Sequence, residues 1–187
     1  LLAVDPTNQL RLLAGNGAQG FTAKVMGQSW GSTSLVSAVG AWDGDNRHDV
    51  VARLGGTLYA YPGDGRGGSL ARVAISAGWE NVDRVTGPGD FDGDRLTDLI
   101  SRNAATGQLV LHRGNGRGGI LGSTVIGISG WNAMRIIVSP GDLTGDGKPD
   151  LLREHTDGTV YAWLMDGGTF LGSTQLPPAA SGWHITH

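Results

Sequence analysis

The amino-acid sequence predicts an all-β protein built from four copies of one short unit. A tryptophan that follows a Gly- or Ser-rich approach recurs about every 50 residues, at Trp30, Trp79, Trp131 and Trp183. A short apolar run recurs at nearly the same interval, as LLAV from Leu1 and then as VVAR, LISR and LLRE. Because two markers keep one register through four copies, they indicate an internal repeat that covers nearly the whole chain.

Each unit is predicted to consist of short antiparallel β-strands. A third marker, a strand followed by a glycine-rich turn, begins at Gln9, Thr57, Gln108 and Thr159. Apolar and polar residues alternate in LYAYP and LVLHR, and the Asn-Gly and Asp-Gly pairs beside them are typical of hairpins. Four short strands per unit match a β-propeller blade, whereas a β-sandwich, the alternative fold, leaves the strict repeat unexplained. The units form one domain and span approximately residues 1–49, 50–98, 99–150 and 151–187.

The composition excludes several classes of protein. The chain has 187 residues, of which 33 are glycine, and its hydrophobic fraction of 39% is too high for a disordered chain. The absence of cysteine excludes disulfides and thiolate metal sites. A net charge of −3 with scattered basic residues argues against a nucleic-acid partner. No stretch approaches the roughly 18 apolar residues of a membrane span.

Acidic residues gather in three loops that share one spacing. The loops cover residues 41–49, 90–98 and 142–150, and oxygen-bearing side chains fall at loop positions 1, 3, 5 and 9. Ca²⁺ takes six to eight oxygen ligands, so a loop wound around the ion would turn alternate residues inward, with a backbone carbonyl from position 7. Glycine permits the positive φ that such winding needs. The predicted ligands are Asp90, Asp92, Asp94, Leu96 and Asp98; Asp142, Thr144, Asp146, Lys148 and Asp150; and Asp43, Asp45, Arg47 and Asp49.

The alternative interpretation is that these Asp-Gly clusters are ordinary turns. Against it, the three loops share one frame, and four carboxylates within the segment 90–98 repel one another unless a cation neutralises them. Mg²⁺ is disfavoured because it prefers fewer protein ligands in a rigid octahedron. In the first loop Ala41 stands at position 1, so we expect a third and weaker calcium site there.

The loop sequences GDFDGDRLTDLI and GDLTGDGKPDLL resemble the FG-GAP (VCBS-type) repeat of integrin-like β-propellers. The full unit, including LYAYPGDGRGG and SAGWENV, is similar to such repeats in secreted actinobacterial proteins. The resemblance implies a blade with Ca²⁺ in the loop between its first two strands. It also implies an extracellular protein that is attached to an enzyme or serves in adhesion or carbohydrate binding.

The repeat frame also describes the two ends of the chain. Leu1 aligns with the start of a second strand, and His187 aligns with Arg135, which lies just before a first strand. The first blade is therefore predicted to lack its inner strand and to leave an unpaired edge. We expect the chain to be part of a longer propeller or to pair with a second copy. A compact four-bladed ring with one truncated blade is the alternative.

The aromatic residues suggest packing first and ligand binding second. A tryptophan present once per unit is predicted to pack between adjacent blades. Tyr59, Tyr61, Tyr161 and Trp163 are candidate sugar platforms, because an aromatic face stacks on the apolar face of a pyranose. Such sites between blades would make the protein a lectin.

No pattern predicts catalysis. The sequence has neither an HExxH nor a GxSxG motif, and its histidines do not recur at one repeat position. His112 is expected on a strand surface, and His48, at loop position 8, is expected to point away from the metal. The functional hypothesis is a non-catalytic, calcium-binding module of a secreted protein that binds, adheres or docks. A lectin for glycan or cell-wall ligands and an accessory domain of a secreted hydrolase are the alternatives.

Overall fold

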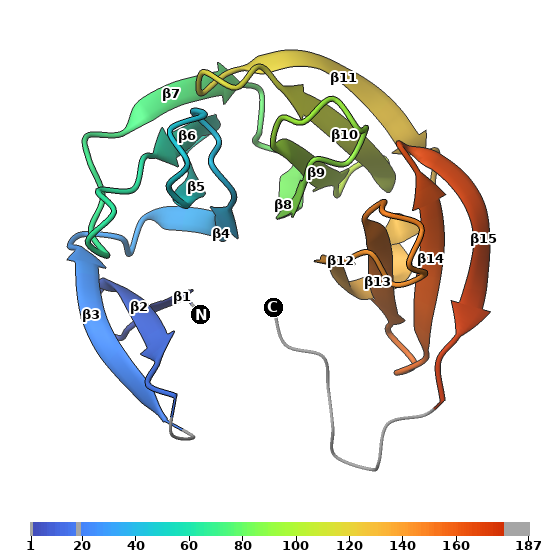
Figure 1. The fold of residues 1–187 in the computed structure, drawn as a ribbon, viewed down its shortest axis with the longest axis horizontal. Helices are drawn as coiled ribbons and strands as arrows, with labels where there is room; N and C mark the ends of the chain where they lie inside the picture. The colour runs from blue at the N-terminus through green and yellow to red at the C-terminus, as the bar shows by residue number, and fades with distance from the viewer. Residues whose placement is uncertain (1, 18–19, 178–187) are drawn as a thin grey trace. The chain divides into compact units, whose positions relative to one another are not determined.

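The computed structural model describes residues 2–17 and 20–177, and within them nearly all regular structure is β (Figure 1). The strands are β1 (Leu2–Val4), β2 (Leu10–Gly15), β3 (Phe21–Gly27), β4 (Thr33–Val39), β5 (Asp49–Leu54), β6 (Thr57–Tyr61), β7 (Val73–Ala77), β8 (Val82–Gly89), β9 (Asp98–Asn103), β10 (Gln108–Gly114), β11 (Ile120–Gly127), β12 (Met134–Gly141), β13 (Asp150–His155), β14 (Val160–Asp166) and β15 (Thr169–Gln175). A 3₁₀ turn, η1 (Trp131–Ala133), precedes β12.

The strands form four antiparallel sheets in which sequence neighbours pair. The sheet orders are β1-β2-β3, β4-β5-β6-β7, β8-β9-β10-β11 and β12-β13-β14-β15. Four-stranded meanders in series are the blades of a β-propeller, so the predicted fold class is confirmed. The first sheet has three strands, as the repeat frame predicts.

The chain divides into two compact units. One comprises residues 1–80 together with 116–119, and the other comprises residues 81–115 together with 120–187. The first unit holds the sheets β1–β3 and β4–β7, and the second holds the sheets β8–β11 and β12–β15.

Three of the recurring tryptophans connect the end of a sheet to a hairpin of the same sheet. The amide of Trp30 donates to the carbonyl of Asn8 at 2.8 Å, and the amides of Trp79 and Trp131 donate in the same way to Gly56 and Gly107. All three indoles are buried. The fourth marker, Trp183, and the C-terminal His187 lie outside the described residues, as does Leu1.

Within each unit a tryptophan also packs against the next sheet. The ring of Trp30 lies 4.4 Å from that of Tyr61 on β6, and the ring of Trp131 lies 4.7 Å from that of Trp163 on β14. These pairs belong to the hydrophobic cores between consecutive sheets. The prediction that the repeated tryptophan packs between adjacent blades is therefore confirmed for Trp30 and Trp131.

Candidate metal loops and ligand cavity

The three acidic loops lie where the repeat frame predicts, between the first and second strands of their sheets. They join β4 to β5, β8 to β9 and β12 to β13. The glycine at loop position 4 has a positive φ in each case: 81° at Gly44, 86° at Gly93 and 82° at Gly145. Only glycine adopts this conformation without steric cost, so the loops turn sharply at that residue.

The aspartate at position 9 anchors each loop to its own sheet. Asp49 is 1% exposed, and Asp98 and Asp150 are 0% exposed. One carboxylate oxygen of Asp98 accepts from the amides of Phe91 at 2.8 Å and Asp92 at 3.3 Å. Its other oxygen accepts from the amide of Gly114, at the end of β10, at 3.0 Å. A carboxylate that accepts three backbone N–H groups holds the loop and the third strand together.

The same anchor recurs in the other two loops. Asp49 accepts from the amides of Trp42 at 2.9 Å, of Asp43 at 3.3 Å and of Gly63 at 2.8 Å. Asp150 accepts from Leu143 at 2.9 Å and from Met165 on β14 at 2.9 Å. The sequence predicted position 9 only as a metal ligand. Its structural role could have been inferred from its position, because a buried apolar strand begins at this aspartate.

The aspartate at position 1 shapes the loop through backbone amides. Asp90 accepts from Gly93 at 2.8 Å and from Arg95 at 2.9 Å. Asp142 makes the equivalent bonds with Gly145 and Gly147, at 2.6 and 2.7 Å. In the first loop, where Ala41 replaces the aspartate, the amide of Gly44 donates instead to the Ala41 carbonyl at 3.2 Å.

Position 5 holds position 7 in every loop. The aspartate at position 5 accepts the amide of the residue at position 7 at 2.8–2.9 Å; the pairs are Asp45 with Arg47, Asp94 with Leu96, and Asp146 with Lys148. This bond fixes the peptide before each position-7 residue, whose carbonyl is a predicted metal ligand.

Two of the loops gather three carboxylates around one point. One oxygen from each of Asp43, Asp45 and Asp49 lies within 4.8 Å of the others, and the same is true of Asp90, Asp92 and Asp98. Calcium–oxygen distances of about 2.4 Å place opposite ligands roughly 5 Å apart, so both groups fit a calcium ion. Ala41 does not prevent the first loop from forming such a group. Asp94 lies outside the group in its own loop.

The third loop differs from the other two. Within the described chain, Asp142, Asp146 and Asp150 do not form a comparable group. Position 3 of this loop is Thr144, whose amide and hydroxyl both face the Asp142 carboxylate, at 3.0 and 3.4 Å. A hydroxyl brings an oxygen without a charge, so this loop has one carboxylate fewer than the loop at 90–98.

The pKa values of the loop aspartates depend on burial, on neighbouring carboxylates and on the amides that they accept. Burial raises the pKa of Asp98, and the nearby charge of Asp92 raises that pKa further, against the lowering effect of the amides. The pKa of Asp49 is raised by burial and by Asp43 in the same way. The pKa of Asp142 is lowered, chiefly by the amide of Gly147. In the first two loops a neighbouring carboxylate thus helps to raise the pKa of the position-9 aspartate.

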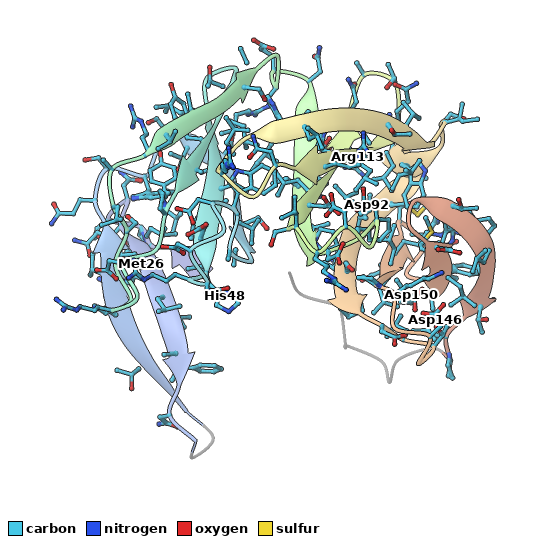
Figure 2. All side chains as sticks on the ribbon, turned by 45° about the horizontal axis from the view of Figure 1, so that its top comes forward. Met26, His48, Asp92, Arg113, Asp146 and Asp150 are labelled. Carbon is cyan, nitrogen blue, oxygen red and sulfur yellow. The ribbon has the colours of Figure 1, made fainter. Side chains whose placement is uncertain are left out.

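Basic side chains lie beside each loop. Arg113 on β10 lies beside Asp92, with 3.9 Å between Nε and a carboxylate oxygen (Figure 2). Arg47 pairs with Asp45 at 3.2 Å, and Lys148 pairs with Asp166 at 2.6 Å. These pairs are solvent-exposed to differing degrees and compensate only part of the loop charge.

The aromatic candidates fall into two kinds. Tyr61 is only 9% exposed and packs on Trp30, so it belongs to the core. Tyr59, Tyr161 and Trp163 are partly exposed. Each of these three carries an arginine over its ring at 4.6–4.9 Å, from Arg72 over Tyr59 and from Arg153 over both Tyr161 and Trp163.

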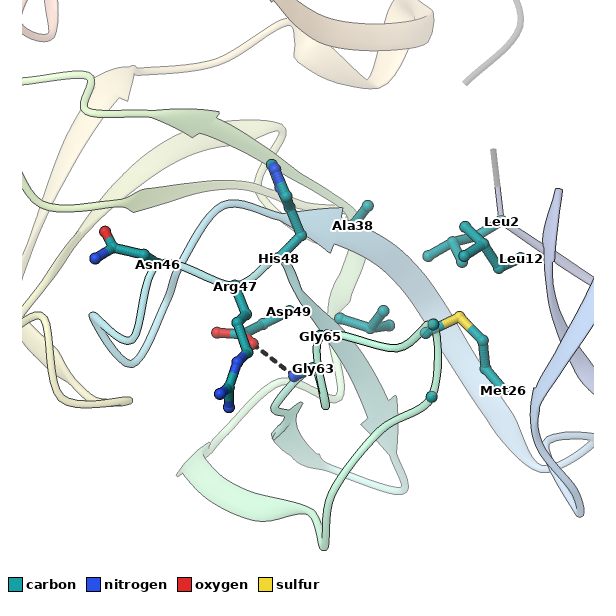
Figure 3. A pocket seen from close by; sticks show the side chains of 13 residues that line it. Leu2, Leu12, Met26, Ala38, Asn46, Arg47, His48, Asp49, Gly63 and Gly65 are labelled. Carbon is teal, nitrogen blue, oxygen red and sulfur yellow. Dashed lines mark hydrogen bonds between the residues drawn. The ribbon is translucent and has the colours of Figure 1, made fainter. Parts of the chain in front are cut away.

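A cavity of about 500 Å³ lies within the first unit, between its two sheets (Figure 3). Leu2, Leu12 and Met26, from β1, β2 and β3, form one wall. The opposite side comes from the first acidic loop and from the glycine-rich turn after β6. Its members include Asn46, Arg47, His48, Asp49, Val50, Gly63 and Gly65. The sequence did not signal this cavity, because its walls come from segments that only the fold brings together.

The two histidines singled out in the sequence differ in their burial. His48 is exposed, and its residue lines the cavity. His112, expected on a strand surface, lies half-buried between two serines, with Nε2 2.8 Å from Ser101 Oγ and Nδ1 2.8 Å from Ser123 Oγ. Burial lowers the pKa of His112 to about 4. The correction follows from the sheet register, because His112 stands on a middle strand where both neighbours supply hydroxyls.

The sheets and their acidic loops define a repeat protein of the β-propeller class. Within it, residues 90–153 match the model of the FG-GAP-like repeat family, so the chain contains an FG-GAP-like repeat. The match begins at the first aspartate of the loop at 90–98 and ends on β13. None of the curated proteins matches the chain in sequence.

A solved structure shares the fold. Its title describes the specific recognition of non-reducing terminal N-acetylglucosamine by a lectin of Agrocybe aegerita. The TM-score is 0.60 at 18% sequence identity, over 91% of this chain and 47% of the lectin chain. This chain therefore spans about half the length of that lectin. In the described part of the chain, no helix is long and apolar enough to cross a membrane.

Proposed function

We propose that this chain is a non-catalytic, calcium-binding module of a secreted protein, and that it binds a ligand or docks a partner. The observation that carries the proposal is the pair of three-carboxylate groups in the loops at 41–49 and 90–98. Both sit on a backbone that a buried aspartate holds in place. The match to the FG-GAP-like repeat supports the same assignment.

In this proposal the loop residues divide their roles. Asp90, Asp92 and Asp98 in one loop, and Asp43, Asp45 and Asp49 in the other, would hold Ca²⁺, with Asp94 and the carbonyls of Arg47 and Leu96 as further oxygens. The sequence assigned the weaker site to the first loop because of Ala41. We reverse that order: the loop with Asp142, Thr144, Asp146, Lys148 and Asp150 would form the weaker site, because its carboxylates are not among the groups of three. The ion supplies positive charge that offsets the carboxylate repulsion, and its contribution to stability rises with free calcium concentration.

A comparison of two variants tests the calcium assignment. We expect Asp92→Ala to lower the melting temperature by roughly 5 °C in millimolar calcium and by much less in chelator, because it removes a ligand. We expect Asp98→Ala to destabilise the protein in both conditions, because it also leaves buried amides without an acceptor. Calorimetry with and without chelator measures both effects.

The outcome that contradicts calcium binding is equally clear. If wild-type melting is indifferent to calcium and Asp92→Ala behaves alike in both buffers, the loops are turns held by their own hydrogen bonds. A native mass measured in the same buffers tests whether copies of the chain associate.

A lectin is the second candidate for the ligand-binding role. It is favoured by the fold shared with an N-acetylglucosamine-binding lectin and by the cavity between two sheets of the first unit. That cavity combines an apolar wall with polar residues of the loop at 41–49, which is the mixture that a sugar ring with hydroxyl groups requires. The role of an accessory domain beside a secreted hydrolase is compatible with either ligand.

A further inference from the structure

Arg153 lies on the second strand of its sheet, at a position where the two other sheets that have an acidic loop carry an uncharged residue. It is the third residue after the anchoring Asp150, and the equivalent residues are Ala52 after Asp49 and Ser101 after Asp98. In the strand register Arg153 pairs with Tyr161, as Ala52 pairs with Tyr59. The frame therefore accepts a small side chain at this position, and the packing of the repeat does not require an arginine.

The guanidinium of Arg153 is held by aromatic rings and has no acidic partner. Its central carbon lies 4.6 Å from the ring centre of Tyr161 and 4.9 Å from that of Trp163. Nη1 lies 3.0 Å from the sulfur of Met134, which is a weak acceptor. Among the described residues no carboxylate lies within ion-pair distance of Arg153, and its buried Nε has no hydrogen-bond acceptor.

The acidic residue next to Arg153 in the sequence, Glu154, pairs with a different arginine. Glu154 follows Arg153 directly on β13, so its side chain points to the opposite face of the sheet. There it accepts from Nε of Arg135 at 3.0 Å. Desolvation lowers the pKa of Arg153, as expected for a cation whose charge has no compensation.

The cluster remains accessible from one side. Arg153, Tyr161 and Trp163 are each partly exposed. Phe170, whose ring lies 4.3 Å from that of Trp163, is 45% exposed. The surface therefore presents the exposed ring of Phe170 and two partly exposed rings next to a cation that has no acidic partner among the described residues. Aromatic faces suit the apolar face of a sugar ring, and a guanidinium suits a carboxylate, which it binds through charge-assisted hydrogen bonds.

We propose that Arg153, with Tyr161, Trp163 and Phe170, binds the carboxylate of an acidic sugar such as a uronic acid. The proposal rests on the lectin candidate and narrows it to a charged class of glycan at a site on the fourth sheet. The sugar ring stacks on the exposed Phe170 ring beside the partly exposed Tyr161 and Trp163, and its carboxylate supplies the acidic partner that the guanidinium lacks.

The test uses a ligand pair that differs only in charge. The wild-type protein is titrated with methyl β-D-glucuronide and with the methyl ester of the same sugar, and the Arg153 Nε–Hε NMR signal, assigned with Arg153→Gln, is followed. We expect the acid to bind at least tenfold more tightly than the ester and to shift that signal. Arg153→Gln should remove the difference. Arg72→Gln, which deletes an exposed arginine over Tyr59, should leave it intact.

A second measurement does not depend on any variant. Added sodium chloride should weaken binding of the glucuronide by the wild-type protein and leave the ester unaffected. N-acetylglucosamine is titrated alongside. If acid and ester bind equally, the acidic-sugar inference is overturned while the lectin candidate stands. If none of the three sugars binds, the lectin candidate and the inference are both overturned.

Discussion

The two sheets of the second unit share one frame and differ in what they place on it. In both, a loop between the first two strands ends in a buried aspartate, Asp98 or Asp150, that accepts amides of its own loop and of the third strand. In the sheet β8–β11 the amide of Trp131 also donates to Gly107 at the hairpin end, whereas the equivalent Trp183 lies outside the described residues. The feature that the two sheets share is therefore a set of hydrogen bonds from backbone amides to the buried aspartate.

The differences lie in side chains at matched positions. An ion pair joins the first and second strands of each sheet with its charges exchanged. In the sheet β8–β11, Arg102 on β9 pairs with Asp83 on β8 at 2.5 Å, whereas in the sheet β12–β15 Glu154 on β13 pairs with Arg135 on β12. Both sheets therefore have an ion pair at this place, but the acidic and basic residues exchange strands.

Other matched positions decide burial and chemistry. Phe91 at loop position 2 is 1% exposed, while its counterpart Leu143 is 45% exposed. Asp92 at position 3 corresponds to Thr144, which leaves the third loop without a three-carboxylate group. The comparison teaches that the backbone anchor and the three-carboxylate group are separable features of one loop.

The largest difference is expected from the residue at position 2. Phe91 belongs to the core with Leu111 and Trp131, so Phe91→Ala should lower the free energy of unfolding by about 3–5 kcal/mol. Leu143→Ala should change it by less than about 0.5 kcal/mol, because that side chain is half exposed. Urea denaturation measures both variants. Equal losses would mean that Leu143 is covered in solution and that the contrast between the sheets is false.

A pH-dependent difference is expected from the middle strands. His112 on β10 occupies the register position that Trp163 occupies on β14, and only the histidine titrates. Its pKa is lowered to about 4 in the folded protein, against about 6.5 in the unfolded chain. The unfolded chain therefore binds the proton first, so the contribution of neutral His112 is complete above pH 6.5 and is lost as the pH falls toward 4.

The measurement compares the wild-type protein with His112→Gln between pH 7 and pH 4. The wild-type protein should lose about 3 kcal/mol more stability over this range than the variant. Parallel pH profiles would contradict the burial of the imidazole between Ser101 and Ser123.

The smallest expected effect sharpens the comparison at loop position 3. Thr144→Asp gives the third loop the carboxylate that Asp92 supplies in the second. The calcium-dependent gain in stability should then exceed that of the wild-type protein by about 1–2 kcal/mol, while stability in chelator should fall because like charges are added. Thr144→Asn, which replaces the hydroxyl by an uncharged amide of the same shape as the aspartate side chain, is the matched control. If both variants respond to calcium as the wild-type protein does, position 3 does not contribute to an ion site.

The sequence predicted the elements that depend on local pattern. Strand alternation, the hairpin glycines and the spacing of Trp30 and Trp131 sufficed for the sheets and for the packing of tryptophan between them. The loops were located correctly, because Asp-Gly spacing reports backbone turns directly. The anchoring role of Asp98 was not predicted, since its partner Gly114 lies on a different strand and hydrogen bonds across strands leave no mark on residue spacing.

By itself, the sequence determined the repeat, the strand class and the residues available as ligands, because these follow from periodicity and from the chemistry of single side chains. Only the tertiary structure decided which carboxylates meet, that Leu2 and Met26 face His48 across a cavity, and that Arg153 lies over two rings without an acidic partner. The physical reason is that ion sites, cavities and unpaired charges depend on distances between strands. Those distances are set by sheet register and packing, which the one-dimensional pattern does not contain.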